Sequence, residues 1–531
     1  MASVLLLAPT LRAGDWNATL GGRSERTGLS VDTGPRTPML LWQGSTSAQL
    51  AQHPVTEGGR VFSTRIENFS DIPDSAFIVA QNLFTGAMLW KKQVPISFSD
   101  SWSTQVLGVR DGQVYASRAS NGSNSEYMYA LDVRDGSILW ISADLVNQAG
   151  SVDSVAFAPN GDVIHGNFQT LVRIDHTNGK TLWRTVRLCP TSSGCSTAVI
   201  GNRIYAWEDF DMPDGLHLVI SRFDAATGAR LYSSAPLKIG LFTIEQIVPL
   251  VGPGFTVYAP LADNTPADTF VALQDTGTAL QEKWRVPMGY PVFGSFGVGP
   301  DGSVYTYSRA NEVLRLDPET GQIQNTSNPI PTDTFTLEPR MAIDALGRVF
   351  LSNGASNLGA LYSFNADLTV RWSQSIPNIY GPALGQNGTL VIAGSGTEFR
   401  VYQTPEANSF YTLTPCRLVD TRDPIGPSGG PALASGTDRG FVLRGRCGVP
   451  STARAVALNV VAVQPSDGPG FFTLYPGGSS LPLASTINYS AGQIRANNAI
   501  IPLGVGGDIA VRCYQGLGTA HLIIDVSGYF Q

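Results

Sequence analysis

Leu131–Trp140, LDVRDGSILW, is the stretch that decides how this 531-residue chain folds. It joins an apolar strand end to an acidic residue, a turn that contains Gly136 and a short strand that ends in Trp140. A tight loop between two antiparallel strands needs a residue at positive φ, which glycine adopts without steric cost. The polar residue before the glycine can also cap the backbone of the turn. The stretch therefore predicts a β-hairpin.

The same hairpin pattern recurs along the first 372 residues. Four more copies keep glycine at the fifth place and end eight residues after they begin: NLFTGAMLW (82–90), DHTNGKTLW (175–183), DAATGARLY (224–232) and DPETGQIQN (317–325). Two looser copies are QDTGTALQEKW (274–284), which carries an insertion, and NADLTVRW (365–372), which lacks the glycine. Successive copies end 41 to 52 residues apart. This spacing is close to the period of about 40–50 residues that is typical of a propeller blade.

A second strand pair precedes each hairpin. Four examples are VLGVRDGQVYA (106–116), VAFAPNGDVIH (155–165), VGPDGSVYTY (298–307) and IDALGRVFLS (343–352). These pairs alternate apolar and polar residues around DG, NG or LG turns, which is typical of strands joined as a hairpin. The repeating unit is therefore a four-stranded blade.

The two ends of the repeat region complement each other. Residues 382–402 provide three strands of a last blade but no fourth strand that ends in tryptophan. Met39–Trp42, near the start, ends in tryptophan but follows no hairpin. We therefore expect an all-β fold with an eight-bladed propeller whose last blade is completed by Met39–Trp42, because closure removes exposed sheet edges.

The repeat resembles the pyrroloquinoline-quinone-like (PQQ-like) propeller repeat, A-x-D-x-x-T-G-x-x-x-W. The matching residues in the first quoted copy are Ala130, Asp132, Gly136 and Trp140. The resemblance covers residues 14–403, and residues 15–42 also carry the D-W and R-T-G-x-S that open such propellers. In that family the tryptophan of each blade docks between blades, where an indole offers a large apolar face and one N–H donor. The resemblance implies docking roles for Trp42, Trp90, Trp140, Trp183, Trp284, Trp372, Gly86, Gly136, Gly179 and Gly228.

The composition changes after the repeats. We interpret residues 404–409 as a polar linker. Residues 410–531 contain short strands separated by glycine and proline, which predict a small β-sandwich-like domain. This part resembles a module of unknown function found at the C-termini of secreted bacterial proteins. The segments that carry this resemblance are Leu413–Arg422 (LTPCRLVDTR), Ala455–Val460 (AVALNV) and Asp525–Phe530 (DVSGYF).

The start of the chain indicates where the protein works. Residues 1–13 form a short apolar run that we interpret as the remnant of a signal peptide, although the positively charged n-region is missing. A buried N-terminal strand is the alternative. No later segment contains the 18 or more apolar residues of a bilayer-spanning helix, so no transmembrane segment is expected. We expect a monomer that is secreted, periplasmic or on the cell surface of a bacterium.

The five cysteines permit disulfides in a chain outside the cytoplasm. Cys189 and Cys195 bracket a short PTSSG loop and form the first expected pair, and Cys416 and Cys447 form the second. Cys513 is then a buried free thiol. Another pairing that involves Cys513 stays open, because spacing does not determine connectivity.

Composition and spacing weigh against several kinds of site. The net charge is −7 with 15% charged residues and no basic stripe, so nucleic acid is not expected as a partner. The histidines at positions 53, 165, 176, 217 and 521 are scattered, and we expect none of them to bind a metal.

Two charged groups have both a functional and a structural interpretation. Asp209, Asp211 and Asp214 resemble a calcium loop, but Pro213 stands where a ligand should be, so a solvated acidic loop is favoured. Arg417, Asp420 and Arg422 could form a binding group, but a structural ion pair is favoured.

Enzymes with a propeller of this kind offer an alternative to a binding function. Quinoprotein dehydrogenases resemble this fold and use adjacent cysteines, a calcium ion held by acidic and amide side chains, and an aspartate base. This chain lacks adjacent cysteines and the common haem, hydrolase, metalloprotease and P-loop motifs. We therefore expect no catalytic residue and no cofactor, and favour a binding or scaffold protein whose propeller is an interaction platform for a protein or glycan of the cell envelope. The alternative is a quinone-dependent oxidoreductase that holds PQQ and calcium.

Overall fold

The computed structural model describes most of the chain as two compact units, residues 1–404 and 405–531. The described residues are 15–44, 50–97, 101–120, 125–148, 154–189, 195–240, 248–261, 269–287, 296–308, 310–334, 339–377, 379, 381–394, 399–404 and 409–531. The expected signal peptide, residues 1–13, lies outside them. The division between the units falls inside the stretch 404–409 that was interpreted as a linker.

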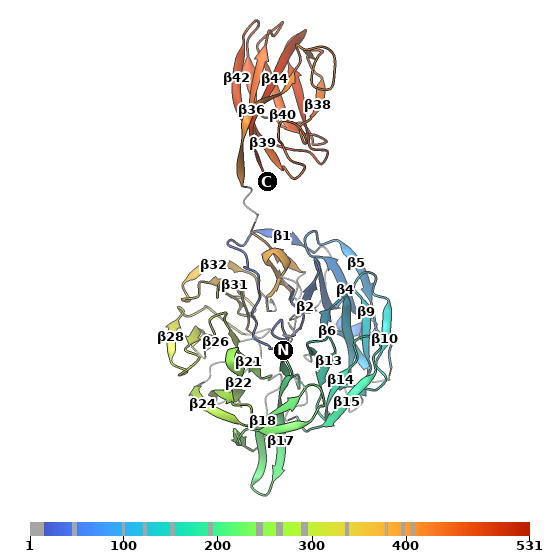
Figure 1. Cartoon of the computed structure of the whole chain (residues 1–531), viewed down its shortest axis with the longest axis vertical. Helices are drawn as coiled ribbons and strands as arrows, with labels where there is room; N and C mark the ends of the chain where they lie inside the picture. Colours follow the sequence, from blue (N-terminus) through green and yellow to red (C-terminus); the bar gives the residue numbers. More distant parts are fainter. Residues whose placement is uncertain are drawn as a thin grey trace, which may run out of the picture. The chain divides into compact units, whose positions relative to one another are not determined.

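The first unit contains eight antiparallel sheets in its described part, seven of four strands and one of five, numbered here in chain order (Figure 1). Sheet 1 has β2 (Leu50–Glu57), β3 (Arg60–Ile66), β4 (Ala76–Asn82) and β5 (Met88–Lys92). Sheet 2 has β6 (Ser101–Arg110), β7 (Gln113–Ser120), β9 (Met128–Asp132) and β10 (Ile138–Ile141). Sheet 3 has β12 (Ala156–Phe157), β13 (Val163–Gly166), β14 (Thr170–Ile174) and β15 (Thr181–Val186). Sheet 4 has β16 (Ala198–Ile200), β17 (Arg203–Met212), β18 (Gly215–Asp224) and β19 (Arg230–Ser233), with β20 (Lys238–Ile239) beside β18.

The remaining sheets follow the same order. Sheet 5 has β21 (Leu250–Val251), β22 (Thr256–Leu261), β23 (Thr269–Asp275) and β24 (Leu280–Pro287). Sheet 6 has β25 (Phe296–Val298), β26 (Val304–Tyr307), β27 (Val313–Leu316) and β28 (Ile323–Thr326). Sheet 7 has β29 (Arg340–Ile343), β30 (Val349–Ser352), β31 (Ala360–Phe364) and β32 (Val370–Ser375). Sheet 8 has β33 (Ala383–Gly385), β34 (Thr389–Ile392), β35 (Arg400–Tyr402) and β1 (Leu40–Gln43).

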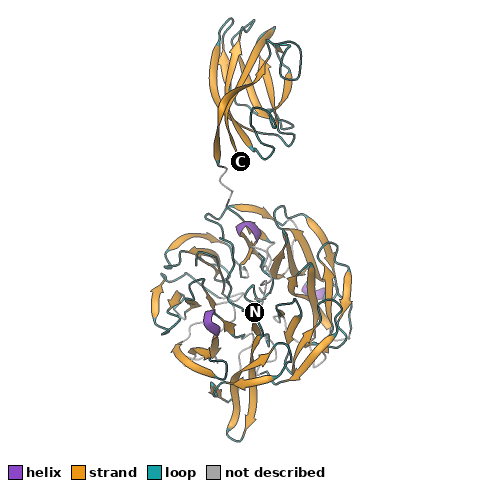
Figure 2. Cartoon of the chain, in the orientation of Figure 1, coloured by secondary structure: helices purple, strands orange, loops and turns teal. Residues whose placement is uncertain are grey.

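The few other elements are short, so the predicted all-β fold is confirmed (Figure 2). They are the pair β8 (Ser125–Glu126) and β11 (Asn147–Gln148) and the 3-10 turns η1 (Phe69–Asp71), η2 (Pro253–Phe255) and η3 (Gln386–Gly388). No helix in the described part of the chain is both long and apolar enough to cross a membrane.

The predicted closure of the last sheet is also confirmed. Strand β1 pairs antiparallel with β35, with Leu40 opposite Tyr402 and Trp42 opposite Val401. The first described strand therefore completes the last sheet of the unit, and the ring has no free end between its first and last strands.

The apolar core of the first unit lies between neighbouring sheets. One buried cluster joins Ile78 of sheet 1 to Val114 of sheet 2, and the next joins Tyr115 of sheet 2 to Val172 of sheet 3. Each sheet is thus buried on both faces, and every residue of inner strands such as β9 and β13 is buried.

The second unit is a two-sheet β-sandwich. Sheet 9 has β36 (Phe410–Asp420), β44 (Thr519–Phe530), β39 (Ala455–Val463) and β42 (Arg495–Pro502), with β37 (Leu433–Ala434) beside β44. Sheet 10 has β38 (Asp438–Val442), β43 (Asp508–Tyr514), β40 (Gly470–Pro476) and β41 (Ile487–Tyr489). Val460 of sheet 9 and Phe472 and Val511 of sheet 10 share one buried cluster.

Candidate functional site

The seams between sheets hold most of the tryptophans that the sequence singled out. Each of five indole N–H groups donates to a backbone carbonyl of the following sheet's hairpin. The pairs are Trp42 with Leu83 (2.8 Å), Trp90 with Val133 (3.1 Å), Trp140 with His176 (2.8 Å), Trp183 with Ala225 (3.0 Å) and Trp284 with Pro318 (3.0 Å). A buried indole N–H needs such an acceptor, so these bonds fix the spacing between sheets.

The hairpin glycines lie directly against these indoles. Gly179 has a φ of +77°, and a Cβ placed on it would lie 2.7 Å from Cε3 of Trp140. The same relation joins Gly86 to Trp42, Gly136 to Trp90, Gly228 to Trp183 and Gly321 to Trp284. Glycine therefore serves two needs at this place, a left-handed turn and the close approach of the neighbouring ring. The sequence predicts the left-handed turn and, through the resemblance, a docking role for the first four glycines, but it does not predict the docking role of Gly321.

Trp372 departs from this pattern. Its ring centre lies 6.0 Å from that of Phe350, and within the described residues its indole N–H has no hydrogen-bond partner. The position that corresponds to Trp in the preceding sheet is occupied by Asn325. The last seams are therefore chemically different from the first ones.

The seam between sheets 4 and 5 uses a carboxylate instead of a carbonyl. Tyr232 takes the place of tryptophan, and its hydroxyl donates to Asp275 at 2.6 Å. Tyr205 and Arg203 donate to the other oxygen of the same carboxylate at 2.5 and 2.6 Å. Burial alone would raise the pKa of Asp275, but the hydrogen bonds from Tyr205 and Tyr232 hold it below its usual range. Burial and the same carboxylate raise the pKa of Tyr232 to about 12.

The N-terminal segment 16–30 runs along the innermost strands in chain order (Figure 1). Trp16 pairs with Thr56 of sheet 1, and Asn17 with Val109 of sheet 2. The oxygens of this segment then accept from backbone N–H groups of sheets 3 to 7. The pairs are Ser24 Oγ with Phe157, Ser24 O with Val199, Glu25 O with Val251, Thr27 O with Val298 and Gly28 O with Ile343. One short segment therefore links seven sheets, and we call it the inner strap.

Arg26 anchors the inner strap. It is fully buried, and its guanidinium donates to the carbonyl of Thr197 at 2.9 Å, to the carbonyl of Leu20 at 3.1 Å and to Ser154 Oγ at 2.9 Å. These contacts join the inner strap to the residues that lead into β12 of sheet 3 and β16 of sheet 4. A buried charge of this kind persists only when its donors are used, so Arg26 of the R-T-G-x-S stretch has a structural role here.

The acidic group of residues 209–214 is solvated only in part, because Asp211 and Asp214 are exposed whereas Asp209 is buried. Asp209 and Asp211 lie in β17, and β17 pairs continuously with β18 up to the turn. Asp209 is 8% exposed, and burial raises its pKa to about 6. Asp214, at the turn, contacts His217 at 2.8 Å. The expectation of a loop is wrong for Asp209, because the ten-residue strands of this hairpin extend through its position.

The histidines have varied surroundings. His165 is fully buried, and burial lowers its pKa to about 3. His521 lies 3.1 Å from Thr421 Oγ1, and the side chain of His53 lies outside the described part. His176 forms, with Asp162 and Asp175, the one metal-sized group of donors found among the described residues. The sequence does not predict this group, because its members come from two separate turns of sheet 3 that only the fold brings together.

That donor group is already satisfied by protein partners. Asp162 accepts from Arg173 at 2.7 Å and contacts His176 Nδ1 at 2.8 Å. Although burial alone would raise the pKa of Asp162, hydrogen bonds from His176, Asn160 and Arg173 lower it to about 2. An arginine that occupies the carboxylate competes with any cation, so the group is an ion-pair network.

Both expected disulfides are confirmed, Cys189–Cys195 and Cys416–Cys447. Cys513 is a buried free thiol whose sulfur lies 3.4 Å from the hydroxyl of Tyr489.

The second unit carries a groove of about 510 Å³ on sheet 9. Its lining residues are Pro415, Cys416, Arg417, Asn459, Asn498, Asp525, Val526 and Ser527. Four of them come from four neighbouring strands at matching register, Arg417 opposite Asp525, Asp525 opposite Asn459 and Asn459 opposite Asn498. We call these four residues the polar row.

The polar row lies on the outer face of sheet 9. Leu458 and Val460, on either side of Asn459, point into the core, so Asn459 faces outward. Arg417 pairs with Asp525 at 2.9 Å. No hydrogen bond reaches the side-chain amides of Asn459 and Asn498 from any described residue.

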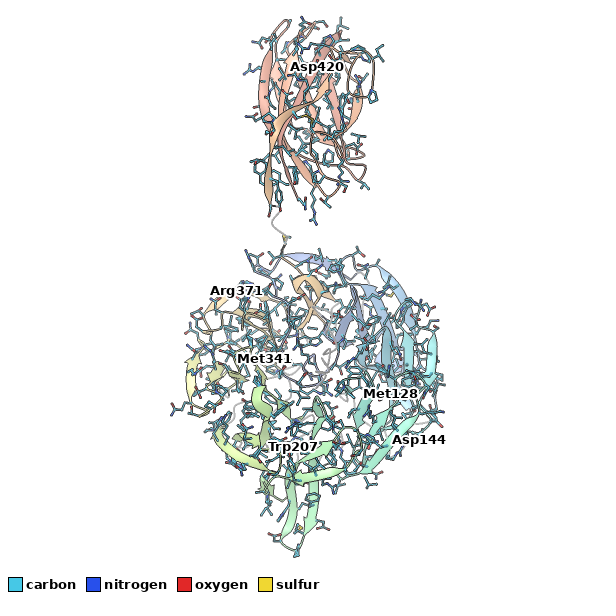
Figure 3. All side chains as sticks on the ribbon, viewed as in Figure 1. Met128, Asp144, Trp207, Met341, Arg371 and Asp420 are labelled. Carbon is cyan, nitrogen blue, oxygen red and sulfur yellow. A yellow bond between two sulfur atoms is a disulfide. The ribbon has the colours of Figure 1, made fainter. Side chains whose placement is uncertain are left out.

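The ion pairs favoured from the sequence lie beside this groove. Asp420 (Figure 3) accepts from Arg422 at 2.7 Å and from Arg417 at 3.2 Å, and these contacts lower its pKa to about 2. Arg417 therefore belongs both to this ion pair and to the polar row. The sequence did offer a signal for the row, because each of the three motif segments of this unit supplies one member.

The comparisons with known proteins bear on the first unit. Residues 29–187 match the family model described as outer membrane protein assembly factor BamB. The quinohemoprotein alcohol dehydrogenase from Comamonas testosteroni has a TM-score of 0.53 at 13% identity, over 76% of this chain and 83% of that one. BamB from Moraxella catarrhalis has a TM-score of 0.46 at 14% identity, over 68% of this chain and 100% of that one. No curated protein matches the chain.

Proposed function

We propose that this protein, a PQQ-like β-propeller followed by a β-sandwich, is a non-catalytic binding or scaffold protein that works outside the cytoplasm. The observation that carries the proposal is that the propeller's distinctive side chains are used to build a fixed ring. Five indoles and the carboxylate of Asp275 join successive sheets, and the inner strap bonds to seven of them. A ring held in this way presents its loops in constant positions, which suits an interaction platform.

The disulfides support the location. Cys189–Cys195 and Cys416–Cys447 are compatible with a periplasmic or extracellular protein, since disulfides persist in oxidising compartments. The partner on the propeller that we propose is a protein or glycan of the cell envelope. The family model matched by residues 29–187 is named for a protein of outer membrane assembly, and this is the precedent for a protein partner.

A quinone-dependent oxidoreductase is the second candidate, because of the fold likeness to a quinohemoprotein alcohol dehydrogenase. The residues described here do not fit that cofactor set. The bonded cysteines Cys189 and Cys195 are six positions apart rather than adjacent. In the described donor group of Asp162, Asp175 and His176, the carboxylate of Asp162 already accepts from Arg173. We therefore derive no catalytic step through a quinone or calcium ion.

One pair of measurements tests the proposal. The purified full chain is immobilised and screened against envelope proteins, glycans and peptidoglycan fragments, and it is separately incubated with PQQ and Ca²⁺, an alcohol or sugar, and an artificial electron acceptor. We expect a specific ligand in the screen and no quinone-dependent turnover. Turnover that requires added quinone would replace this function with the oxidoreductase. A propeller ligand is recognised by unchanged binding to a variant with Asn459→Ala and Asn498→Ala in the second unit.

A further inference from the structure

The groove on sheet 9 has the features of a ligand site, and we propose that it binds a neutral oligosaccharide through the polar row. This inference concerns the second unit alone and does not depend on the function proposed for the propeller. It rests on the chemistry of the row, its charge, the neighbouring aromatic rings and the size of the groove.

The polar row supplies the mixture of groups that hydroxyls require. A hydroxyl both donates and accepts, whereas guanidinium groups only donate, carboxylates only accept and amides do both. Arg417, Asp525, Asn459 and Asn498 place these three kinds of group side by side across four strands. Adjacent hydroxyls on a sugar ring can thus each find a complementary partner. The amides of Asn459 and Asn498 are free to serve, since they make no hydrogen bond within the described residues.

The charge of the groove favours a neutral ligand. Its only ionised lining residues are Arg417 and Asp525, which pair with each other at 2.9 Å and cancel in charge. Arg417 is further engaged by Asp420 at 3.2 Å. An anionic ligand would have to displace these carboxylates, and a cationic ligand would meet the half-exposed guanidinium. A ligand that carries hydroxyls without net charge meets neither cost.

Aromatic rings continue the groove at one end. Phe410 and Phe530 are neighbours across β36 and β44, with ring centres 5.0 Å apart. The ring of Phe410 lies over Gly528, which follows Ser527 of the groove lining, and it is 49% exposed. An exposed flat ring offers apolar area at little entropic cost, and the C–H face of a pyranose is apolar in the same way.

The size of the groove agrees with this ligand. A volume of about 510 Å³ lies in the range of roughly 300–1,000 Å³ of small-molecule sites, where a few polar groups fix orientation. The groove crosses the strands at an open sheet face, so a chain of sugar units can pass along it without threading into the core.

Titration calorimetry on the full chain tests the proposal. The probes are the neutral hexasaccharides cellohexaose, maltohexaose, xylohexaose, mannohexaose and hexa-N-acetylchitohexaose, with a galacturonate hexamer as the charged comparison. We expect at least one neutral hexasaccharide to bind and the galacturonate hexamer not to bind. Asn459→Ala and Asn498→Ala are each expected to weaken binding by about ten-fold or more, the loss expected when one site hydrogen bond is removed.

Asn488→Ala is the matched control, because Asn488 is an exposed asparagine on β41 of the other sheet. Its binding should equal that of the wild type. Asn498 is also exposed, so its variant keeps the fold and carries the test even if the Asn459 variant unfolds. The proposal is overturned if no neutral hexasaccharide binds at millimolar concentration, if only the charged hexamer binds, or if Asn498→Ala binds as the wild type does.

Discussion

Two seams of the propeller solve the same packing problem with different chemistry. At the seam between sheets 2 and 3, Trp140 donates to the carbonyl of His176 and packs on Gly179. At the seam between sheets 4 and 5, Tyr232 donates to the carboxylate of Asp275, which also accepts hydrogen bonds from Tyr205 and Arg203. The first seam depends on close packing of an indole and one neutral hydrogen bond, whereas the second depends on a buried carboxylate. A repeat can therefore lose its tryptophan when the next blade supplies a carboxylate in the right place.

The largest effect is expected at the tryptophan seam. Trp140→Ala removes an indole that is 8% exposed, and it should lower the free energy of unfolding by about 3–5 kcal/mol through the cavity that it leaves. Urea denaturation followed by circular dichroism measures this. Leu139→Ala is the control, because Leu139 is 48% exposed and should change little. An unchanged urea midpoint for Trp140→Ala would show that packing of the indole does not stabilise this seam.

The carboxylate seam should respond to loss of charge at constant shape. Asp275→Asn is expected to cost about 2–3 kcal/mol at pH 7, because hydrogen bonds to a buried ionised group are stronger than neutral ones and Arg203 loses its counter-charge.

The same variant gives a pH dependence with a defined sign. The pKa of Asp275 is lowered in the folded protein, so its stabilising contribution is complete above the unfolded pKa of about 4 and is lost as the pH falls through the folded pKa. The difference in unfolding free energy between wild type and Asp275→Asn should therefore shrink below about pH 4. A difference that stays constant down to pH 2 would contradict the charge-based account. Trp140→Ala should show no such trend.

The glycine under the indole gives the next effect. Gly179→Val is expected to destabilise by about 2 kcal/mol, because a β-branched residue is strained at positive φ and its Cβ would press on Trp140. Gly201→Val separates the two causes, since Gly201 also has positive φ but nothing within 4 Å of a built Cβ. Equal losses for both variants would show that the contact with Trp140 adds nothing.

The smallest effect is expected at the tyrosine hydroxyl. Tyr232→Phe keeps the ring and removes one of the donors to Asp275, so we expect a loss of about 1 kcal/mol. In a double-mutant cycle with Asp275→Asn, the double variant should lose less stability than the sum of the two single losses, because both substitutions weaken the interaction between Tyr232 and Asp275. If the loss of the double variant equals the sum of the single losses, Tyr232 and Asp275 do not stabilise the fold through each other.

The sequence repeat predicts the propeller, but it does not predict which side chains contact each other across the seams. Spacing alone placed the hairpins, and the complementary ends of the repeat region placed β1 beside β35. The partners of Asp275 were hidden, because Arg203 and Tyr205 belong to the preceding blade and lie about 70 residues away in the chain. Local patterns report turn chemistry and burial, but contacts across a seam depend on the stacking of whole sheets.

The candidate groove was only partly visible in the sequence. Arg417 was noted for its ion pair with Asp420, and that interpretation is correct but incomplete. Asn459 lies in an alternating strand and Asn498 in a largely exposed one, and an outward polar residue is ordinary in both. Only the strand order of sheet 9 shows that these residues meet in one row.

The pairing of β1 with β35 affects how the protein is made. Roughly 360 residues separate Gln43 from Tyr402, and at about 5–20 residues per second a ribosome needs on the order of 20–70 s to cover that distance. During that time β1 has no partner strand, whereas the inner strap gains its partners one sheet at a time, from Thr56 to Ile343. A product that ends before Arg400 would leave β1 and β34 as unpaired edges, so premature termination should yield an aggregating fragment rather than a smaller propeller.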